Sequence, residues 1–237
     1  MATVMAARLV VLETSGRVGQ VALAEGDQLR GVQRLDETRR HARDLAPAVL
    51  ELLQAQGWLA SSITDVVVSR GPGSYTGLRV GIMSAKTLAY ATGCRLIAVD
   101  TFAAIAEGVQ MGTEVLEVIA DAQQEKVYRQ CFGRAGADGG WQAVDPLGIV
   151  TLESWLGQRD NGVPVTGPGL HAYGARLPIC VQQLSADRWD PTVEAVLRLG
   201  LIRRRQGLIE NPWMLEPLYL RPSAAEEKRL ARIAGAQ

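Results

Sequence analysis

The sequence feature that most constrains the fold is a glycine-rich loop between a short apolar strand and a long apolar helix. The strand is predicted at Asp65–Ser69, and the loop reads Gly71-Pro72-Gly73-Ser74-Tyr75-Thr76-Gly77. Its three glycines allow backbone dihedrals that other residues rarely adopt, and its proline fixes one dihedral. A loop of this kind before a helix directs free N–H groups at whatever lies in front of the helix. It therefore predicts either a rigid corner of the fold or an anion-binding site.

The loop does not match the known nucleotide-binding or catalytic loops. A P-loop needs four residues between its glycines and then Gly-Lys-Ser/Thr, whereas three residues separate Gly73 from Gly77 and Leu78 follows. The glycine spacing from Gly71 to Gly77 is one residue too long for the dinucleotide fingerprint. A nucleophile elbow has the pattern Gly-x-Ser-x-Gly, whereas Ser74 has Gly73 directly before it and Gly77 three residues after it. By itself, the loop assigns no activity.

Composition narrows the class of protein. A chain of 237 residues with 47% hydrophobic content fits one large domain or two lobes. Its zero net charge gives no global reason to bind nucleic acid or an anionic membrane. Cys94, Cys131 and Cys180 form no Cys-x-x-Cys pair, and His41 lies far from His171, so neither a disulfide framework nor a metal site is expected. Without a signal-peptide pattern or a membrane-length apolar run, we expect a cytoplasmic protein.

Hydrophobic periodicity predicts two lobes built on one plan. In the first half, three strands precede a helix, a strand, a helix and a strand, near residues 9–12, 19–24, 29–35, 43–56, 65–69, 78–91 and 95–99. The second half repeats a hairpin and a Gly-Pro-Gly sequence, at residues 115–121, 126–132 and 167–169. We expect an N-terminal lobe with the glycine loop, a C-terminal lobe and an extension that packs back on the N-terminal lobe, at residues 1–103, 104–207 and 208–237.

Proline positions set the expected ends of two helices. Pro47 fits only the first turn of its helix, which is therefore predicted to begin near Arg43. Residues 191–205 are predicted as a helix with Asp190 as its N-cap. Beyond it we expect a proline-rich extended segment on the surface of a lobe and a short charged helix, at residues 211–222 and 224–233.

In each predicted lobe, the first strand ends at an acidic residue. Glu13 is followed by Thr14 and Ser15, and Asp121 ends the corresponding strand of the second half. In a two-lobed fold these carboxylates would face one cleft, where such acids position metal-bound phosphates. Glu13, Thr14, Ser15 and Asp121 are therefore the candidate residues of a nucleotide cleft.

The helix predicted at Leu78–Ala91 is apolar on nearly all sides. One face can pack on its own sheet, while the others require cover from a second element. Burial inside one lobe and contact with a second subunit both remain open. In the second case, this helix and the one at 43–56 would form a four-helix contact with the same pair of another subunit. The residues expected there are Leu45, Val49, Leu52, Leu53, Leu78, Ile82, Ala85 and Ala89.

Several of these motifs together resemble the TsaB (YeaZ) family. The resemblance rests on the run from Arg70 to Gly81 and its helix to Asp100-Thr101, Leu12-Glu13-Thr14-Ser15, His41 with Leu45-x-Pro47, and Asp121-Ala122 with Val127-Tyr128. It implies a two-lobed α/β fold of the actin, Hsp70 and sugar kinase type, with repeated βββαβαβα lobes. It also implies a non-catalytic scaffold subunit of the complex that forms threonylcarbamoyladenosine in tRNA.

The resemblance carries expectations about partners as well. It implies a TsaD-like catalytic paralogue, a TsaE-like ATPase, a homodimer when the chain is isolated, and tRNA contact only through the complex. No cofactor and no membrane are expected, and ATP or ADP binding in the complex is left open.

The chain departs from the family pattern in one position. Glu13 stands where members usually carry aspartate, and the longer carboxylate would alter phosphate or metal geometry at that loop. The His-x-x-x-His metal motif of the catalytic paralogue has no counterpart here. The alternative function is a free-standing nucleotide-binding phosphotransferase or hydrolase of the actin-like fold, which includes the older label of glycopeptidase.

Overall fold

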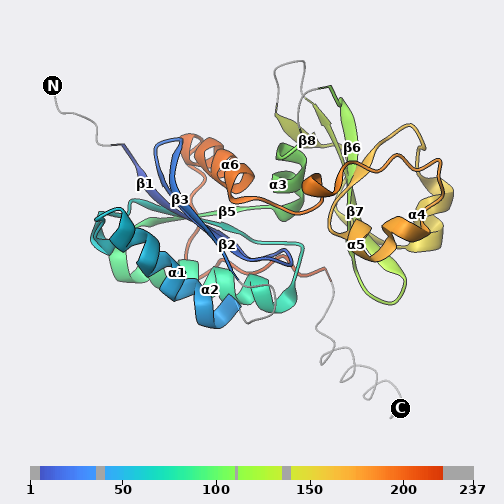
Figure 1. Ribbon diagram of the computed structural model, residues 1–237. Coiled ribbons are helices and arrows are strands. Elements are labelled where there is room, and N and C mark those ends of the chain that lie inside the picture. The colour runs from blue at the N-terminus through green and yellow to red at the C-terminus, as the bar shows by residue number, and fades with distance from the viewer. Residues whose placement is uncertain (1–5, 36–40, 110–111, 135–139, 221–237) are drawn as a thin grey trace, which may run out of the picture.

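Two α/β lobes make up the described part of the chain, which comprises residues 6–35, 41–109, 112–134 and 140–220 (Figure 1). In this computed structural model, the first lobe is built on a five-stranded sheet with the order β3-β2-β1-β4-β5. β1 pairs antiparallel with β2 and parallel with β4, which in turn pairs parallel with β5. The strands are β1 Arg8–Glu13, β2 Gln20–Glu25, β3 Gln28–Arg34, β4 Asp65–Ser69 and β5 Arg95–Val99.

Helices cover both faces of this sheet (Figure 1). α1 and α2 lie on one face and α6 lies on the other. The helices of the described residues are α1 His41–Ala55, α2 Tyr75–Thr92, α3 Thr101–Glu107, α4 Leu152–Gln158, α5 Gly169–Tyr173 and α6 Val193–Arg205, with 3-10 turns η1 Ala60–Ser62, η2 Gly174–Arg176 and η3 Ala186–Arg188. Side chains alternate between the faces of a strand. Val10 and Leu12 of β1 therefore join the core under α1 and α2, while Leu9 and Val11 join the core under α6.

The second lobe repeats the strand pairing of the first. Its sheet has the order β10-β6-β7-β8, and β9 also pairs with β7. The antiparallel β6–β7 pair and the parallel β6–β10 pair correspond to β1–β2 and β1–β4. Gly71 and Gly167, the first glycines of the two Gly-Pro-Gly sequences, both have positive φ, +119° and +111°. The strands are β6 Val115–Asp121, β7 Lys126–Arg134, β8 Trp141–Ala143, β9 Gly148–Thr151 and β10 Val165–Thr166.

α6 packs on the sheet of the first lobe, although it follows the second lobe in the sequence. Gly200 lies directly over β4, because a Cβ there would approach Cγ1 of Val67 to 2.6 Å. The predicted division groups α6 with the C-terminal lobe at residues 104–207. We propose instead that residues 193–205 belong to the N-terminal lobe as the helical layer on its second face.

The described part of the extension, residues 208–220, also lies on the first lobe. The backbone N–H of Glu210 donates to the carbonyl oxygen of Leu96 at 2.8 Å, and that of Leu218 donates to Arg70 at 2.7 Å. Leu215 is buried in the core beneath α1 and α2. The charged helix predicted at residues 224–233 lies outside the described residues.

Two helices begin earlier than predicted. α1 begins at His41 and not near Arg43, so Pro47 lies in its second turn. Pro47 is exposed there, and the helix tolerates the loss of one backbone hydrogen bond on its solvent side. α2 begins at Tyr75, because Ser74 supplies the N-cap before the apolar run starts.

α6 begins later than predicted. Its N-cap is Thr192, whose Oγ1 accepts a hydrogen bond from the backbone N–H of Ala195 at 3.3 Å. Asp190, the predicted cap, instead lies 2.8 Å from Nε2 of His171. Of the helices in the described residues, none is long and apolar enough to cross a membrane.

Candidate functional site

The glycine loop packs closely against the end of β1. A Cβ at Gly73 would lie 2.5 Å from the carbonyl oxygen of Ser15, and a Cβ at Gly77 would overlap the carbonyl oxygen of Thr14. In the next turn of α2, a Cβ at Gly81 would overlap the hydroxyl of Thr14. A Cβ does not fit at these three positions: Gly73 and Gly77 are required by the close approach of two backbones, and Gly81 by the Thr14 side chain.

Hydrogen bonds hold the two segments together. The backbone N–H of Ser74 donates to the carbonyl oxygen of Ser15 at 2.8 Å, and the hydroxyl of Thr14 donates to the carbonyl oxygen of Gly77 at 2.8 Å. The Ser74 hydroxyl accepts a hydrogen bond from the N–H of Gly77 at 3.2 Å. These contacts are those of a rigid corner, one of the two alternatives that the sequence leaves open.

The exposed residues of the motif hold the C-terminal extension. The rings of Tyr75 and Tyr219 stack with their centroids 4.8 Å apart. The guanidinium of Arg79 lies 4.3 Å from the ring centre of Tyr75, and its Nε donates to the hydroxyl of Tyr219 at 3.0 Å. Thr76 is exposed beside them. The sequence analysis missed this cluster, because 140 positions separate Arg79 from Tyr219 and no local pattern links them.

Glu13 is closed off by its own loop. Its Oε1 accepts hydrogen bonds from the N–H and the hydroxyl of Ser15, at 2.6 and 2.5 Å, and from the N–H of Gly16 at 3.3 Å. The residue is fully buried, and desolvation raises the pKa of its carboxyl above 4.5 against the opposing hydrogen bonds. Glu13 therefore presents no exposed oxygen to a nucleotide cleft.

Asp121 is engaged within the second lobe. It accepts hydrogen bonds from the N–H of Gln123 at 2.7 Å and from the hydroxyl of Tyr173 at 2.8 Å. Burial, with this hydrogen bond, raises the pKa of Tyr173 to about 12. Within the described residues, no group of three or more histidine, cysteine, aspartate or glutamate side chains is placed to hold a metal ion.

The residues predicted for a subunit interface lie mainly in the core of the first lobe, which corrects that prediction. Buried side chains cannot reach a partner, and in both helices the apolar face predicted from periodicity packs on the chain's own sheet. The buried members are Leu45, Leu53, Leu78, Ile82, Ala85 and Ala89, and Val49 and Leu52 are partly buried against the same core.

Other apolar side chains of α1 and α2 are exposed to solvent. Met83 is 58% exposed, Tyr90 77% and Leu50 55%. The extension adds Trp213 and Met214, and the rings of Tyr90 and Trp213 meet edge to face at 5.9 Å. We refer to Leu50, Met83, Tyr90, Trp213 and Met214 as the outer apolar face. α2 is thus apolar on two sides as predicted, but the exposed set differs from the predicted one.

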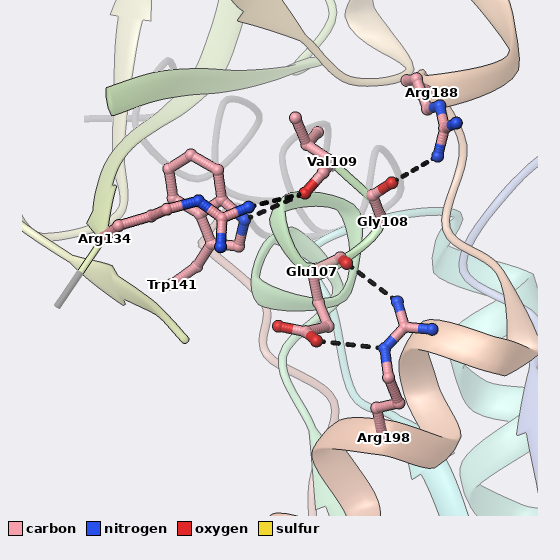
Figure 2. A pocket seen from close by; sticks show the side chains of 7 residues that line it. All are labelled: Glu107, Gly108, Val109, Arg134, Trp141, Arg188 and Arg198. Atoms are coloured by element: carbon pink, nitrogen blue, oxygen red, sulfur yellow. Dashed lines mark hydrogen bonds and ion pairs between the residues drawn. The ribbon is translucent and has the colours of Figure 1, made fainter. Parts of the chain in front are cut away.

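A second candidate site is a cavity of about 600 Å³ near the junction of the lobes (Figure 2). Three arginines and a tryptophan line this cavity. They are spread over 65 positions, from Arg134 to Arg198, so no local sequence motif indicates the cavity. The lining residues are Glu107, Gly108, Val109, Arg134, Trp141, Arg188 and Arg198.

Known proteins are similar to this chain in sequence and in fold. Residues 25–138 match the family model for TsaD, tRNA N6-adenosine threonylcarbamoyltransferase. The tRNA threonylcarbamoyladenosine biosynthesis protein TsaB of Escherichia coli is 30% identical over 229 residues, which cover 93% of this chain and 97% of that protein. The protein of the same name from Haemophilus influenzae is 26% identical over 93% of this chain and 96% of its own length.

A solved structure agrees with these relatives. YeaZ from Pseudomonas aeruginosa superposes with a TM-score of 0.77 and 25% identity, over 90% of this chain and all of that one. The predicted two-lobed fold of the actin type is confirmed. Because the similarity to E. coli TsaB extends over nearly the full length of both proteins, the chain belongs to the TsaB (YeaZ) family.

Proposed function

We propose that this chain acts in tRNA threonylcarbamoyladenosine biosynthesis as a non-catalytic subunit that pairs with a TsaD-like catalytic paralogue. The names of its relatives from E. coli and H. influenzae support the pathway. The outer apolar face carries the proposal of a paired subunit, because its apolar and aromatic side chains on α1, α2 and the extension remain largely exposed in the described part of the chain.

The composition of the outer apolar face fits a protein interface. Aromatic residues and methionine are enriched in interface cores, and exposed tyrosine and tryptophan often contribute most of the binding energy. The TsaD family model matches residues 25–138, a range that includes α1 and α2. A partner of that family would present an equivalent helix pair, which allows a nearly symmetric four-helix contact. The same geometry accounts for a homodimer when the chain is isolated.

The contacts around the predicted cleft residues support a non-catalytic role. Glu13 bonds to its own loop, and the glycine loop is filled by Thr14 and Ser15. Neither segment presents an open group for phosphate chemistry. A required cofactor is therefore not part of the proposal, and a TsaE-like ATPase would supply nucleotide hydrolysis in the complex.

Substitution of the exposed face tests the pairing. We expect Met83→Glu and Tyr90→Glu each to weaken capture of the purified paralogue about tenfold or more, since an unpaired charge in an apolar contact is costly. Both side chains are exposed, so circular dichroism and thermal unfolding should not change.

A matched control replaces an exposed apolar residue of the second lobe. Ile179→Glu introduces the same charge at a fully exposed site and should leave capture unchanged. Wild-type affinity of both helix variants for the paralogue, measured by titration calorimetry, would exclude the outer apolar face as the interface.

A further inference from the structure

The cavity near the lobe junction is built around the C-terminal end of α3 (Figure 2). Its walls come from four separate elements. Arg134 is the last residue of β7, and Trp141 is the first residue of β8. Arg188 lies in η3, and Arg198 lies on α6. The second lobe, its exit segment and the returning helix thus meet around one helix end.

Three guanidinium groups donate to the carbonyl oxygens at this helix end. Nη2 of Arg198 donates to Glu107 at 2.9 Å, and Nη1 of Arg188 donates to Gly108 at 2.7 Å. Nη2 of Arg134 donates to Val109 at 3.0 Å. The end of a helix carries unpaired carbonyls and partial negative charge, which explains why cations gather here. The contacts also fix the direction of each guanidinium.

The positive charge that lines the cavity exceeds the negative charge there. Three guanidinium groups line it against one carboxylate, Glu107, which lies 3.1 Å from Nε of Arg198. Asp187 pairs with Nε of Arg188 at 3.0 Å but is itself 66% exposed. The hydrogen bonds described above leave Nη2 of Arg188 and Nη1 of Arg198 unused. In a chain of zero net charge, this local excess favours an anionic ligand.

Trp141 adds an aromatic surface to the cationic wall. The guanidinium of Arg134 lies 4.5 Å from its ring centre, and the indole Nε1 donates to the carbonyl oxygen of Val109 at 3.4 Å. The ring is partly exposed. An anchored indole beside arginines matches the platforms on which proteins stack nucleic-acid bases, with arginine neutralising the phosphate.

We propose that this cavity binds a phosphorylated nucleotide unit, with Arg188 and Arg198 on the phosphate and Trp141 beside the base. The volume of about 600 Å³ lies within the range of small-ligand sites and fits one nucleotide. The unit comes from an RNA strand or from a free nucleotide, and both present the same chemistry. The inference goes beyond the scaffold role, because it gives the chain a ligand of its own. The cavity borders α6 through Arg198, and α6 covers the face of the sheet opposite α1 and α2 (Figure 1).

The binding test uses the whole chain and three probes: adenosine 5′-monophosphate, adenosine and a short single-stranded oligoadenylate RNA. We expect adenosine to bind about tenfold more weakly than its monophosphate, because charge-assisted hydrogen bonds to the phosphate are lost. Arg188→Gln and Arg198→Gln keep an amide N–H donor, which is two bonds shorter than the guanidinium Nη, and remove the charge. Each should weaken binding of the phosphorylated probes about tenfold, whereas Arg30→Gln, on the exposed edge strand β3, should have no effect.

Salt dependence separates the two sources of the phosphate. For an RNA strand, the logarithm of the affinity should fall with the logarithm of salt concentration by roughly 0.7 for each phosphate neutralised. Each glutamine variant should then reduce this slope by roughly 0.7. A free-nucleotide site would bind the monophosphate as tightly as the RNA. Absence of binding by both phosphorylated probes below about 5 mM, or equal binding by wild type and both variants, would overturn the proposal.

A measurement on the wild-type chain avoids dependence on the folding of the variants. The indole N–H resonance of Trp141, assigned by its loss in Trp141→Phe, should shift when the RNA or the monophosphate is added. A resonance that stays in place at saturating probe would also overturn the site. Capture of the paralogue by the arginine variants should remain at the wild-type level, so failure of this proposal and failure of the subunit pairing are distinguishable.

Discussion

Glu13 shows how one residue can look catalytic in the sequence and prove structural in the fold. A carboxylate at the end of the first strand is well placed for phosphate chemistry in a two-lobed protein. Here its oxygen Oε1 accepts three hydrogen bonds from Ser15 and Gly16, and the side chain is fully buried. The sequence predicts the position of the carboxylate but cannot predict that the next two residues fold back onto it.

The raised pKa of Glu13 predicts a pH-dependent stability. The pKa of this carboxyl is near 4.5 in the unfolded chain and higher in the folded chain. Its contribution to stability is therefore fully present at pH values below the unfolded-state pKa. The contribution is lost as the pH rises through the folded-state pKa. Glu13→Gln keeps the acceptor for Ser15 but does not titrate. Relative to wild type, the variant should therefore gain stability as the pH rises above 4.5. Urea unfolding between pH 4 and 8 measures this, and parallel profiles for the two proteins would contradict it.

Gly77 and Gly157 give a matched pair of glycine substitutions. A Cβ at Gly77 would overlap the backbone of Thr14, which cannot move without breaking the corner, so Gly77→Ala should cost about 2 kcal/mol or more. Gly157 is exposed in α4 with open space around it, and Gly157→Ala should be neutral or stabilise by about 0.5–1 kcal/mol. Chemical unfolding of both variants checks the prediction, which would be wrong if the two changed stability equally.

At the level of elements, α1 and α2 each have two apolar sides, of which one packs on the chain's own sheet and the other is exposed. Leu53 of α1 is 4% exposed and packs in the core, while Leu50 on the same helix is 55% exposed. Periodicity in the sequence identifies an apolar face but does not say whether a sheet of the same chain or another subunit covers it. The predicted interface residues are in the core for this reason.

Two alanine substitutions in α1 distinguish the roles of its buried and exposed sides. Leu53→Ala should destabilise the chain by about 2–5 kcal/mol, because it removes buried methyl groups and leaves a cavity. Leu50→Ala should change stability by less than about 0.5 kcal/mol and should instead weaken pairing with the paralogue. Thermal unfolding and capture measured on the same samples test both halves. A stable Leu53→Ala variant that loses its partner would restore the original assignment.

In the whole molecule, the sequence predicts well what depends on local patterns. The five strands of the first sheet, the β6–β7 hairpin and the repeated Gly-Pro-Gly follow from alternation and turn residues. It fails where distant segments meet: α6 on the first sheet, Tyr219 on Tyr75, and the arginines around the end of α3. These contacts carry no local signal, since each partner looks like an ordinary exposed or apolar residue in its own segment.

The most direct test of the proposed subunit role is the threonylcarbamoyladenosine content of tRNA in cells of the same species that lack this chain and receive a variant of it. We expect Glu13→Gln and Ile179→Glu to restore the modification to the wild-type level, because neither touches the outer apolar face. We expect Tyr90→Glu to fail while the variant protein remains folded. Full restoration by Tyr90→Glu together with loss of the modification in Glu13→Gln would contradict a non-catalytic subunit that acts through this face.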